Sequence, residues 1–334
     1  MKRITLTRRS LVSALTVATT VGMAALAPMT ASAQDAYPSK MVRIVVPFPP
    51  GGSTDLLARK IGEKLSAQWK QTVIVDNRPG AGGTVGADHV SKAAPDGYTL
   101  LIGVTGSNGI AGSLYPNLPY DPIKGFTPVT AVVSAPLIIV RNERLSAKTL
   151  PELVAAAKAK PGSITYGSPG TGTSMHLTGE MFELATKTAL LHIPYRGSAG
   201  ALTDLMGGQI DLMFGDVLVV MPQIEAKKIT PIAVTSKERH PLFPNVPTVA
   251  ESGYPGFEAL SWQGLFAPPG TPAAVVDKIN KDVNAALASP DIQEYFVSRG
   301  FKLGGSGAAE YKAFIEAENK KWAGIVKTAG VKPD

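Results

Sequence analysis

Cysteine is absent from the 334 residues, which excludes disulfide bonds and every metal site that depends on thiolate ligands. Dense runs of lysine and arginine are also absent from residues 34–334, so the chain lacks the basic patch typical of nucleic-acid binding. No stretch beyond residue 33 is apolar enough, over sufficient length, to span a membrane. A G-x-S-x-G elbow and an H-E-x-x-H motif are missing too, which disfavours two common classes of hydrolase.

The N-terminus carries the features of an export signal. Residues 2–9 hold four basic side chains and no acid, residues 11–26 are mostly apolar, and Ala31-Ser32-Ala33 matches the small-x-small cleavage rule. We expect a signal peptide over 1–33, cleavage near Ala33 and a periplasmic mature protein. Arg8-Arg9 also fits a twin-arginine signal, so this route and the Sec route both stay open. Removing the segment takes away four of the 33 basic residues and none of the 26 acidic ones, so the net charge falls from +7 to +3.

The rest of the chain alternates between strand and helix signals. Short β-branched runs at 41–48, 71–78 and 98–104 are separated by segments with helical periodicity or glycine-rich turns. In the first helix, Leu57, Ile61, Leu65 and Trp69 recur every four residues and form one apolar face. This alternation predicts an α/β fold with parallel sheets.

Two longer strand signals, at 131–143 and 257–272, divide the chain. Between them the alternation of strand and helix starts afresh, and beyond them the chain turns helical. We expect an inserted domain at 141–265 and a first domain built from 34–140 and 266–334. The two crossing strands would then form the hinge between the domains.

Several predicted strands end in turns rich in glycine, serine and threonine. Ligands of open parallel sheets bind beyond the carboxyl ends of the strands, where helix N-termini present unpaired N–H groups and a partial positive charge. Such turns suit a carboxylate held by neutral donors, although any one of them also fits a plain strand-to-helix turn. The turns lie at 47–55, 104–109, 167–174, 195–200 and 214–216.

The turn at 167–174 nearly matches a phosphate-binding loop. Threonine stands at 173, where the motif has the lysine that balances the charge of the β- and γ-phosphates. We therefore do not expect nucleotide hydrolysis. The loop keeps backbone N–H groups and hydroxyls, which are sufficient for one carboxylate.

Three side chains near these turns have alternative interpretations. His176 follows Ser174 too closely along a helix to face it, so it favours a capping or pocket-lining role over a catalytic one. Asp216 at a pocket edge fits either a turn cap or an acceptor for an amino or hydroxyl group of a ligand. Arg196 fits either a partner for a ligand carboxylate or a solvated loop arginine. We predict no catalytic residue, no metal and no cofactor.

Four long runs together resemble the Bug family, the periplasmic substrate-binding proteins of tripartite tricarboxylate transporters. They are "YPSKMVRIVVPFPPGGSTDLLAR", "VDNRPGAGGTVGADHVSKAAPDGYTLL", "LLHIPYRGSAGALTDLMGGQIDLMF" and "VPTVAESGYPGFEALSWQGLFAPPGTP". The resemblance covers essentially all of the mature chain. It implies a type II periplasmic-binding-protein fold, a Venus flytrap of two α/β domains joined by two crossing strands. It also implies capture of small organic acids, held largely by backbone amides, hydroxyls and water.

The resemblance and the turns together give a set of candidate ligand-binding residues. One departure from the family pattern is Gly215, because an acidic or amide residue is common directly after the phenylalanine. The candidates are Phe48, Pro50, Gly51, Gly52, Asp55, Thr105, Ser107, Ser168, Gly170, Thr171, Gly172, Thr173, Ser174, His176, Tyr195, Arg196 and Asp216.

The resemblance also implies partners. We expect a monomer that delivers a small organic acid to the membrane permease subunits of a tripartite transporter. Two alternatives stay open: a receptor that feeds a signalling partner instead, and an exported hydrolase, for which the sequence offers no activated nucleophile or metal cluster.

Overall fold

The protein is described here by a computed structural model that covers residues 37–333. The predicted signal peptide and its cleavage point lie outside these residues. None of the helices between 37 and 333 is both long enough and apolar enough to cross a membrane.

The first sheet combines three parallel strands with two antiparallel ones. Strand β1 lies between β2 and β3 and runs parallel to both, and β9 then pairs antiparallel with β3 and with β4. A short strand, β10, pairs with the outer edge of β4. The bounds are β1 Val42–Val46, β2 Val73–Asn77, β3 Thr99–Val104, β4 Thr127–Arg141, β9 Leu260–Ala267 and β10 Lys302–Leu303.

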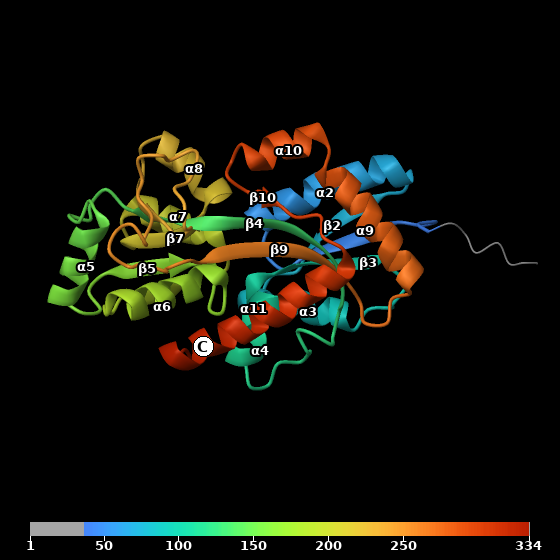
Figure 1. The fold of residues 1–334 in the computed structure, drawn as a ribbon, viewed down its shortest axis with the longest axis horizontal. Helices are drawn as coiled ribbons and strands as arrows, with labels where there is room; N and C mark the ends of the chain where they lie inside the picture. The colour runs from blue at the N-terminus through green and yellow to red at the C-terminus, as the bar shows by residue number, and fades with distance from the viewer. Residues whose placement is uncertain (1–36, 334) are drawn as a thin grey trace, which may run out of the picture. The chain divides into compact units, whose positions relative to one another are not determined.

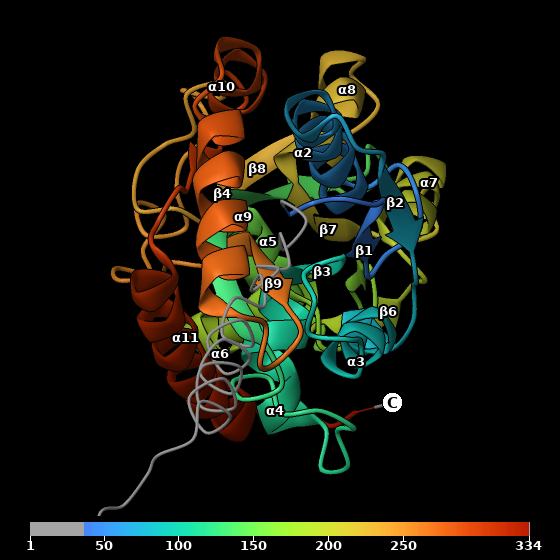
Figure 2. The same cartoon turned by 90° about the vertical axis from the view of Figure 1, so that its right-hand side faces the viewer.

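Helices cover both faces of this sheet. The predicted apolar face of α2 is confirmed, because Leu57, Ile61, Leu65 and Trp69 are all buried. Figure 2 shows α9 and α11 following one another along the same side of the sheet, where both pack on β4. The helices are α2 Ser53–Trp69, α3 Thr84–Ser91, α4 Ala111–Leu114, α9 Ala273–Leu287, α10 Pro290–Val297 and α11 Ala308–Ala329.

The second sheet is built on the far end of β4. Residues Leu137–Arg141 of that strand pair antiparallel with β7 and β8, and β7 pairs parallel with β5, which pairs parallel with β6. The side chains of Tyr166, Phe182 and Phe214 fill its core. Its elements are β5 Thr165–Ser168, β6 Leu191–Pro194, β7 Leu212–Asp216, β8 Thr230–Val234, α5 Leu150–Ala159, α6 Ser174–Thr186, α7 Ser198–Gly207 and α8 Val217–Glu225.

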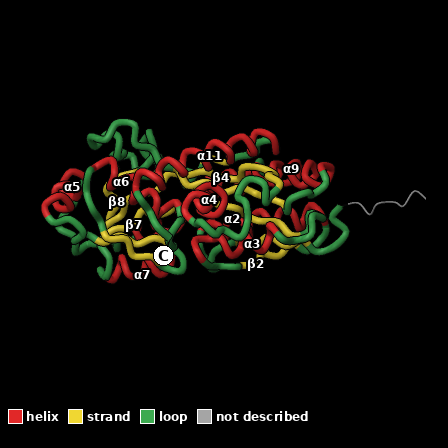
Figure 3. Tube along the Cα trace, turned by 90° about the horizontal axis from the view of Figure 1, so that it is seen from below, coloured by secondary structure: helices red, strands yellow, loops and turns green. Residues whose placement is uncertain are grey.

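Two crossings connect the sheets, as the sequence predicted. Strand β4 belongs to both sheets, and β9 enters the first sheet at Leu260, directly after Ala259 has bonded Thr235 of the second (Ala259 N to Thr235 O, 2.9 Å). Figure 1 shows β4 and β9 side by side between the half that holds α5 to α8 and the half that holds α2, α3 and α9. Seen from below, the strands lie inside and helices surround them in each half (Figure 3).

The C-terminal helix α11 ties the crossing to both halves. It packs against the segment after β3, against β4 and against α6. Glu318 of α11 accepts hydrogen bonds from the indole N–H groups of Trp262 in β9 and Trp322, at 2.8 and 2.9 Å. The crossing therefore contains a buried carboxylate whose acceptor oxygen is shared by two indoles.

Three local expectations were incomplete or wrong. The turn at 104–109 is not a loop, because Thr105–Ile110 form a π-helix that leads into α4. The sequence analysis did not predict α10 or β10. Helix α2 starts after Gly52 without a side-chain cap, although Ser53, Thr54 and Asp55 all follow it.

Candidate ligand-binding site

A cavity of about 90 Å³ lies where the starts of α2, α6 and α7 meet the crossing strand β9. The first turns of these helices contribute backbone N–H groups that have no partner within the helix, together with serine and threonine hydroxyls. The lining residues are Phe48, Pro49, Pro50, Gly52, Ser53, Thr54, Val104, Gly106, Pro169, Thr173, Ser174, Met175, Arg196, Gly197, Ser198, Ala199, Gly200, Asp216, Ser261 and Gln263.

The turn between β1 and α2 is braced by Asp55. Its carboxylate accepts the Gly51 N–H at 3.0 Å, an amide hydrogen of Asn77 at 3.0 Å and a two-point contact from Arg59 at 2.9 Å. Although burial alone would raise it, these hydrogen bonds hold the pKa of Asp55 below its ordinary value. The amide of Asn77 also donates to the Phe48 carbonyl at 3.0 Å. Asp55 therefore shapes the turn from behind and does not line the cavity.

The turn between β5 and α6 uses most of its own donors internally. Gly170 N–H donates to Ser168 Oγ at 3.2 Å, Gly172 N–H to His176 Nδ1 at 3.1 Å, and Thr173 N–H to the Gly170 carbonyl at 3.3 Å. Gly170 and Gly172 have positive φ angles of 140° and 79°, which favour glycine. The anion-facing part is thus the start of α6, at Thr173 and Ser174, and not the glycine loop as a whole.

Thr173 and Ser174 each have a second function in the structure. Thr173 is the N-cap of α6: its hydroxyl accepts the N–H of His176 and donates to the Gly170 carbonyl at 2.8 Å. The Ser174 hydroxyl pairs with the hydroxyl of Ser261 in β9 at 2.9 Å. The start of α6 is therefore tied to the crossing strand.

Arg196 is the only cation among the described residues that line the cavity. It is exposed and lies just before Gly197 and Ser198, which start α7. A Cβ at Gly197 would lie 3.2 Å from the ring of Pro49, so the two turns approach each other closely here. Arg196 occupies the rim of the cavity and not its floor.

Asp216 is the only acid that lines the cavity within the described part of the chain. It caps α8, because Oδ1 accepts the Leu218 N–H at 3.1 Å. Burial raises the pKa of its carboxyl, and hydrogen bonds from the Ser53 hydroxyl and the Leu218 N–H oppose that effect. Gly215 beside it has no room for a side chain, since a Cβ there would lie 2.3 Å from Val220.

Two stacked histidines lie behind the β5–α6 turn. The rings of His176 and His192 are 3.9 Å apart, His176 Nε2 lies 3.4 Å from Glu180, and Ser168 Oγ lies 2.7 Å from His192 Nε2. Ser168 is fully buried and does not line the cavity. The serine–histidine pair therefore cannot present a nucleophile to a ligand there. Between residues 37 and 333, no group of three histidine or acidic side chains is placed to hold a metal ion.

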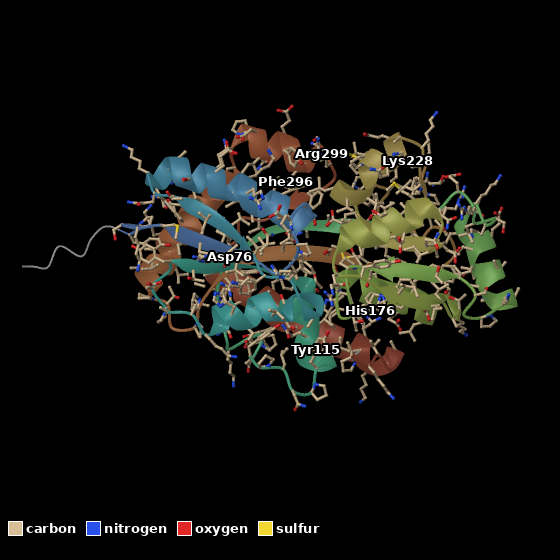
Figure 4. All side chains as sticks on the ribbon, turned by 180° about the vertical axis from the view of Figure 1, so that it is seen from behind. Asp76, Tyr115, His176, Lys228, Phe296 and Arg299 are labelled. Carbon is tan, nitrogen blue, oxygen red and sulfur yellow. The ribbon has the colours of Figure 1, made fainter. Side chains whose placement is uncertain are left out.

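Direct contacts close the two halves around the site. The Tyr115 hydroxyl donates to the Thr171 carbonyl at 3.2 Å, and a Cβ at Gly82 would lie only 2.4 Å from the same carbonyl oxygen. Both His176 and Tyr115 lie near the middle of the molecule, where the teal and yellow-green parts of the ribbon meet (Figure 4). A larger hollow of about 620 Å³ lies beside this seam and shares Phe48, Pro49, Pro169 and Arg196 with the cavity.

The candidate residues from the sequence fall into three groups. Those that line the cavity are Phe48, Pro50, Gly52, Thr173, Ser174, Arg196 and Asp216. Those that line only the outer hollow are Gly170, Thr171 and Tyr195. Those that line neither are Gly51, Asp55, Thr105, Ser107, Ser168, Gly172 and His176.

Several residues outside both cavities support the site. Thr105 exchanges hydrogen bonds with the backbone of Trp262 (2.9 and 3.2 Å), and the hydroxyl of Ser107 donates to Asn108 at 2.6 Å. Tyr195 donates its hydroxyl to Asp204 at 2.7 Å, so its polar end is occupied. These contacts fix the strand ends from which the cavity is built.

Sequence reasoning missed part of the lining. Ser53 and Ser198 start helices in turns that were singled out as rich in glycine and serine, so their positions gave a usable signal. Ser261 and Gln263 gave none, because they come from the crossing strand and reach the cavity only through the pairing of β9 with β3 and β4.

Comparison with known proteins identifies the family. The model of the tripartite tricarboxylate transporter family receptor matches residues 57–331, and the chain belongs to this family. The predicted Bug resemblance is confirmed by the structure of the periplasmic binding protein BugD, which is 39% identical with a TM-score of 0.84 over 89% of this chain and 99% of that one.

Two similar structures contain ligands. R. palustris Rpa4515 with adipate is 36% identical, with a TM-score of 0.86 over 89% of this chain and 100% of that one. MatC from Rhodopseudomonas palustris, with bound malate, is 32% identical, with a TM-score of 0.83 over 87% and 100%. The type II periplasmic-binding-protein fold predicted from the sequence is thereby confirmed, and the chain is a family receptor of the carboxylate-binding kind.

Proposed function

We propose that this chain captures one small organic carboxylate in the cavity between its two halves and delivers it to a tripartite tricarboxylate-type permease. The observation that carries the proposal is the convergence of three helix starts on one cavity at the crossing strands. Helix N-termini stabilise a negative charge, and serine and threonine hydroxyls add donors without adding a buried cation. The adipate and malate held by the two similar proteins are ligands of this chemistry.

Neutral donors suit a receptor that must also release its ligand. A buried salt bridge costs desolvation of both partners, which often cancels its attraction. The described lining offers a single arginine, and that side chain lies at the rim. Binding strength then depends on how closely the halves approach, and less on one charge pair.

The division into domains follows from the same proposal. We propose that residues 34–140 with 266–334 move against residues 141–265, and that β4 and β9 bend where they cross. Support comes from β4, which pairs with β9 in its first part and with β7 and β8 in its last five residues. Closure of this kind buries a ligand between two rigid units.

Export completes the proposal. The mature protein would start after Ala33, act in the periplasm as a monomer and present its closed form to the permease subunits. It would need no cofactor and perform no catalysis. The alternative of a sensor partner is distinguished by uptake: deletion of the gene abolishes accumulation of the labelled acid if the protein serves transport, and leaves it intact if the protein serves signalling.

The first test is a thermal-shift screen of the mature protein against organic acids, beginning with adipate and L-malate. A ligand that binds only the folded state stabilises it by about 2.7 kcal/mol at a hundredfold excess over Kd. We expect a selective rise in Tm with at least one carboxylate, reduced by Ser174→Ala. No rise with any acid, in protein shown by mass spectrometry to hold no co-purified molecule, would contradict the proposal.

A further inference from the structure

The acid in the cavity is unusual for a site that receives anions. Asp216 is 3% exposed, and its two hydrogen-bond partners, the Leu218 N–H and the Ser53 hydroxyl, are both neutral. No ion pair within residues 37–333 joins it to a cation, and Arg196 is exposed at the rim. A buried carboxylate without a cation is costly, by several kcal/mol in folded proteins. A ligand carboxylate placed beside it would add repulsion between like charges.

A second acceptor lies next to Asp216. The side-chain carbonyl oxygen of Gln263 is buried and has no hydrogen-bond partner among the described residues, while its amide nitrogen contacts the Ser53 hydroxyl at 3.4 Å. Ser53 thus links Gln263 of the crossing strand to Asp216 of the second half. One part of the cavity therefore offers acceptors, while the helix starts offer donors.

A ligand that satisfies both parts must carry a carboxylate and a donor group. We propose that the donor is an ammonium group: the receptor takes an α-amino acid, with its carboxylate on the helix starts and its ammonium on Asp216 and the carbonyl oxygen of Gln263. This inference rests on the proposed carboxylate-receptor function and specifies its ligand class.

The ammonium explains features that other donors do not. A hydroxyl supplies one hydrogen bond and no charge, so Asp216 would stay an uncompensated anion. An ammonium supplies three donors and a positive charge, which matches two adjacent acceptors of which one is a carboxylate. Neither adipate nor malate, the ligands of the two similar structures, carries such a group.

The test compares matched acids by isothermal titration calorimetry on the mature protein. Each series holds an amino acid, its hydroxy analogue and its unsubstituted analogue: aspartate, malate and succinate; glutamate, 2-hydroxyglutarate and glutarate; alanine, lactate and propionate; phenylalanine, phenyllactate and 3-phenylpropionate. We expect the amino acid to bind at least tenfold more tightly than both analogues in the series that binds best.

Asp216→Asn tests the position of the ammonium. Asparagine still caps a helix, so the variant keeps the α8 cap and loses only the charge. It should abolish the preference for the amino acid, whereas Asp277→Asn, an exposed acid on α9, should leave it unchanged. A preference that survives in Asp216→Asn would overturn the assignment of the ammonium to this residue.

The outcomes separate the two proposals. If an unsubstituted or hydroxy acid binds as tightly as its amino acid, the ligand class is wrong and the carboxylate receptor stands. If no member of any series binds, both proposals fail.

A measurement on the wild-type protein covers the case in which the variant does not fold. An ammonium needs Asp216 ionised, so amino-acid affinity should rise as pH increases through the raised pKa of this carboxyl. Arg196 is the other charged group that lines the cavity, and it stays protonated throughout. Amino-acid affinity that falls over this range would count against the inference.

Discussion

The turns before α2 and α6 do the same task with opposite chemistry. In the first, a buried carboxylate with a lowered pKa, Asp55, gathers an arginine, an amide side chain and a backbone N–H. In the second, hydroxyls and the neutral nitrogen of His176 hold the glycine loop. The charged brace keeps its ions behind the turn, so both turns present only neutral donors to the cavity. Rigidity and anion binding are thus supplied by different residues, and the two can be broken separately.

Asp55→Ala should have the largest effect. It leaves the Gly51 N–H, the Asn77 amide and Arg59 without their shared acceptor, so we expect a loss of about 3 kcal/mol in the free energy of unfolding and loss of measurable ligand binding. Urea denaturation and calorimetry measure the two effects. Asp277→Ala, on the exposed side of α9, is the control and should change neither. A stable Asp55→Ala protein with intact affinity would show that the brace is dispensable.

Gly82→Ala should prevent full closure while sparing the fold. Its Cβ would meet the Thr171 carbonyl oxygen at 2.4 Å, across the seam between the halves. Gly162→Ala is a matched control, because Gly162 has a similar φ (73° against 62°) and open space around its Cβ position. Both substitutions carry the same backbone strain of about 1 kcal/mol. Only Gly82→Ala should weaken ligand binding, by about 10- to 100-fold, and enlarge the ligand-bound particle in small-angle scattering. Equal affinities would remove the seam from the mechanism.

The two halves should also respond to pH with opposite signs. Burial raises the pKa of Glu183 in α6 to about 7, so the folded state holds a proton that the unfolded state releases, and stability falls as pH rises from about 4.5 to 7. The lowered pKa of Asp55 acts the other way: its contribution is present above the unfolded value of 3.8 and is lost as pH falls below it. Glu183→Gln should therefore stabilise the protein by about 2 kcal/mol at pH 8 and by little at pH 4.5. Urea titrations at the two pH values measure this, and equal gains at both would contradict the assignment.

Thr173→Val should have the smallest effect. It removes the N-cap of α6 and the bond to Gly170 while keeping the shape of the side chain, for a loss of about 1 kcal/mol in the free energy of unfolding. Affinity should fall several-fold, because the helix start then frays at the cavity. Thr149→Val, the N-cap of α5 and remote from the cavity, should cost similar stability without weakening binding. If both variants bind normally, the cap has no part in the site.

Much of the fold was predictable because strand and helix periods are local properties. The long strand signal at 131–143 and the apolar face of Leu57, Ile61 and Leu65 both appear in the structure where the sequence placed them. The site was less predictable, because which side of a turn faces the ligand is decided by tertiary contacts. Asp55 and Thr173 look equivalent as polar residues at helix starts, yet one points away from the cavity to Arg59 and the other lines it. Gln263 could not be found at all, since strand pairing alone brings it to the cavity.

The carboxylate that joins the indoles of Trp262 and Trp322 gives the protein an internal optical reporter. Trp262 belongs to β9, while Glu318 and Trp322 belong to α11, so bending of the crossing strand changes the distance between an indole N–H and a buried negative charge. The emission of a tryptophan shifts when the field along its ring changes. Ligand-driven motion can therefore be followed by intrinsic fluorescence in stopped flow without a dye or a label, and Trp262→Phe identifies which indole carries the signal.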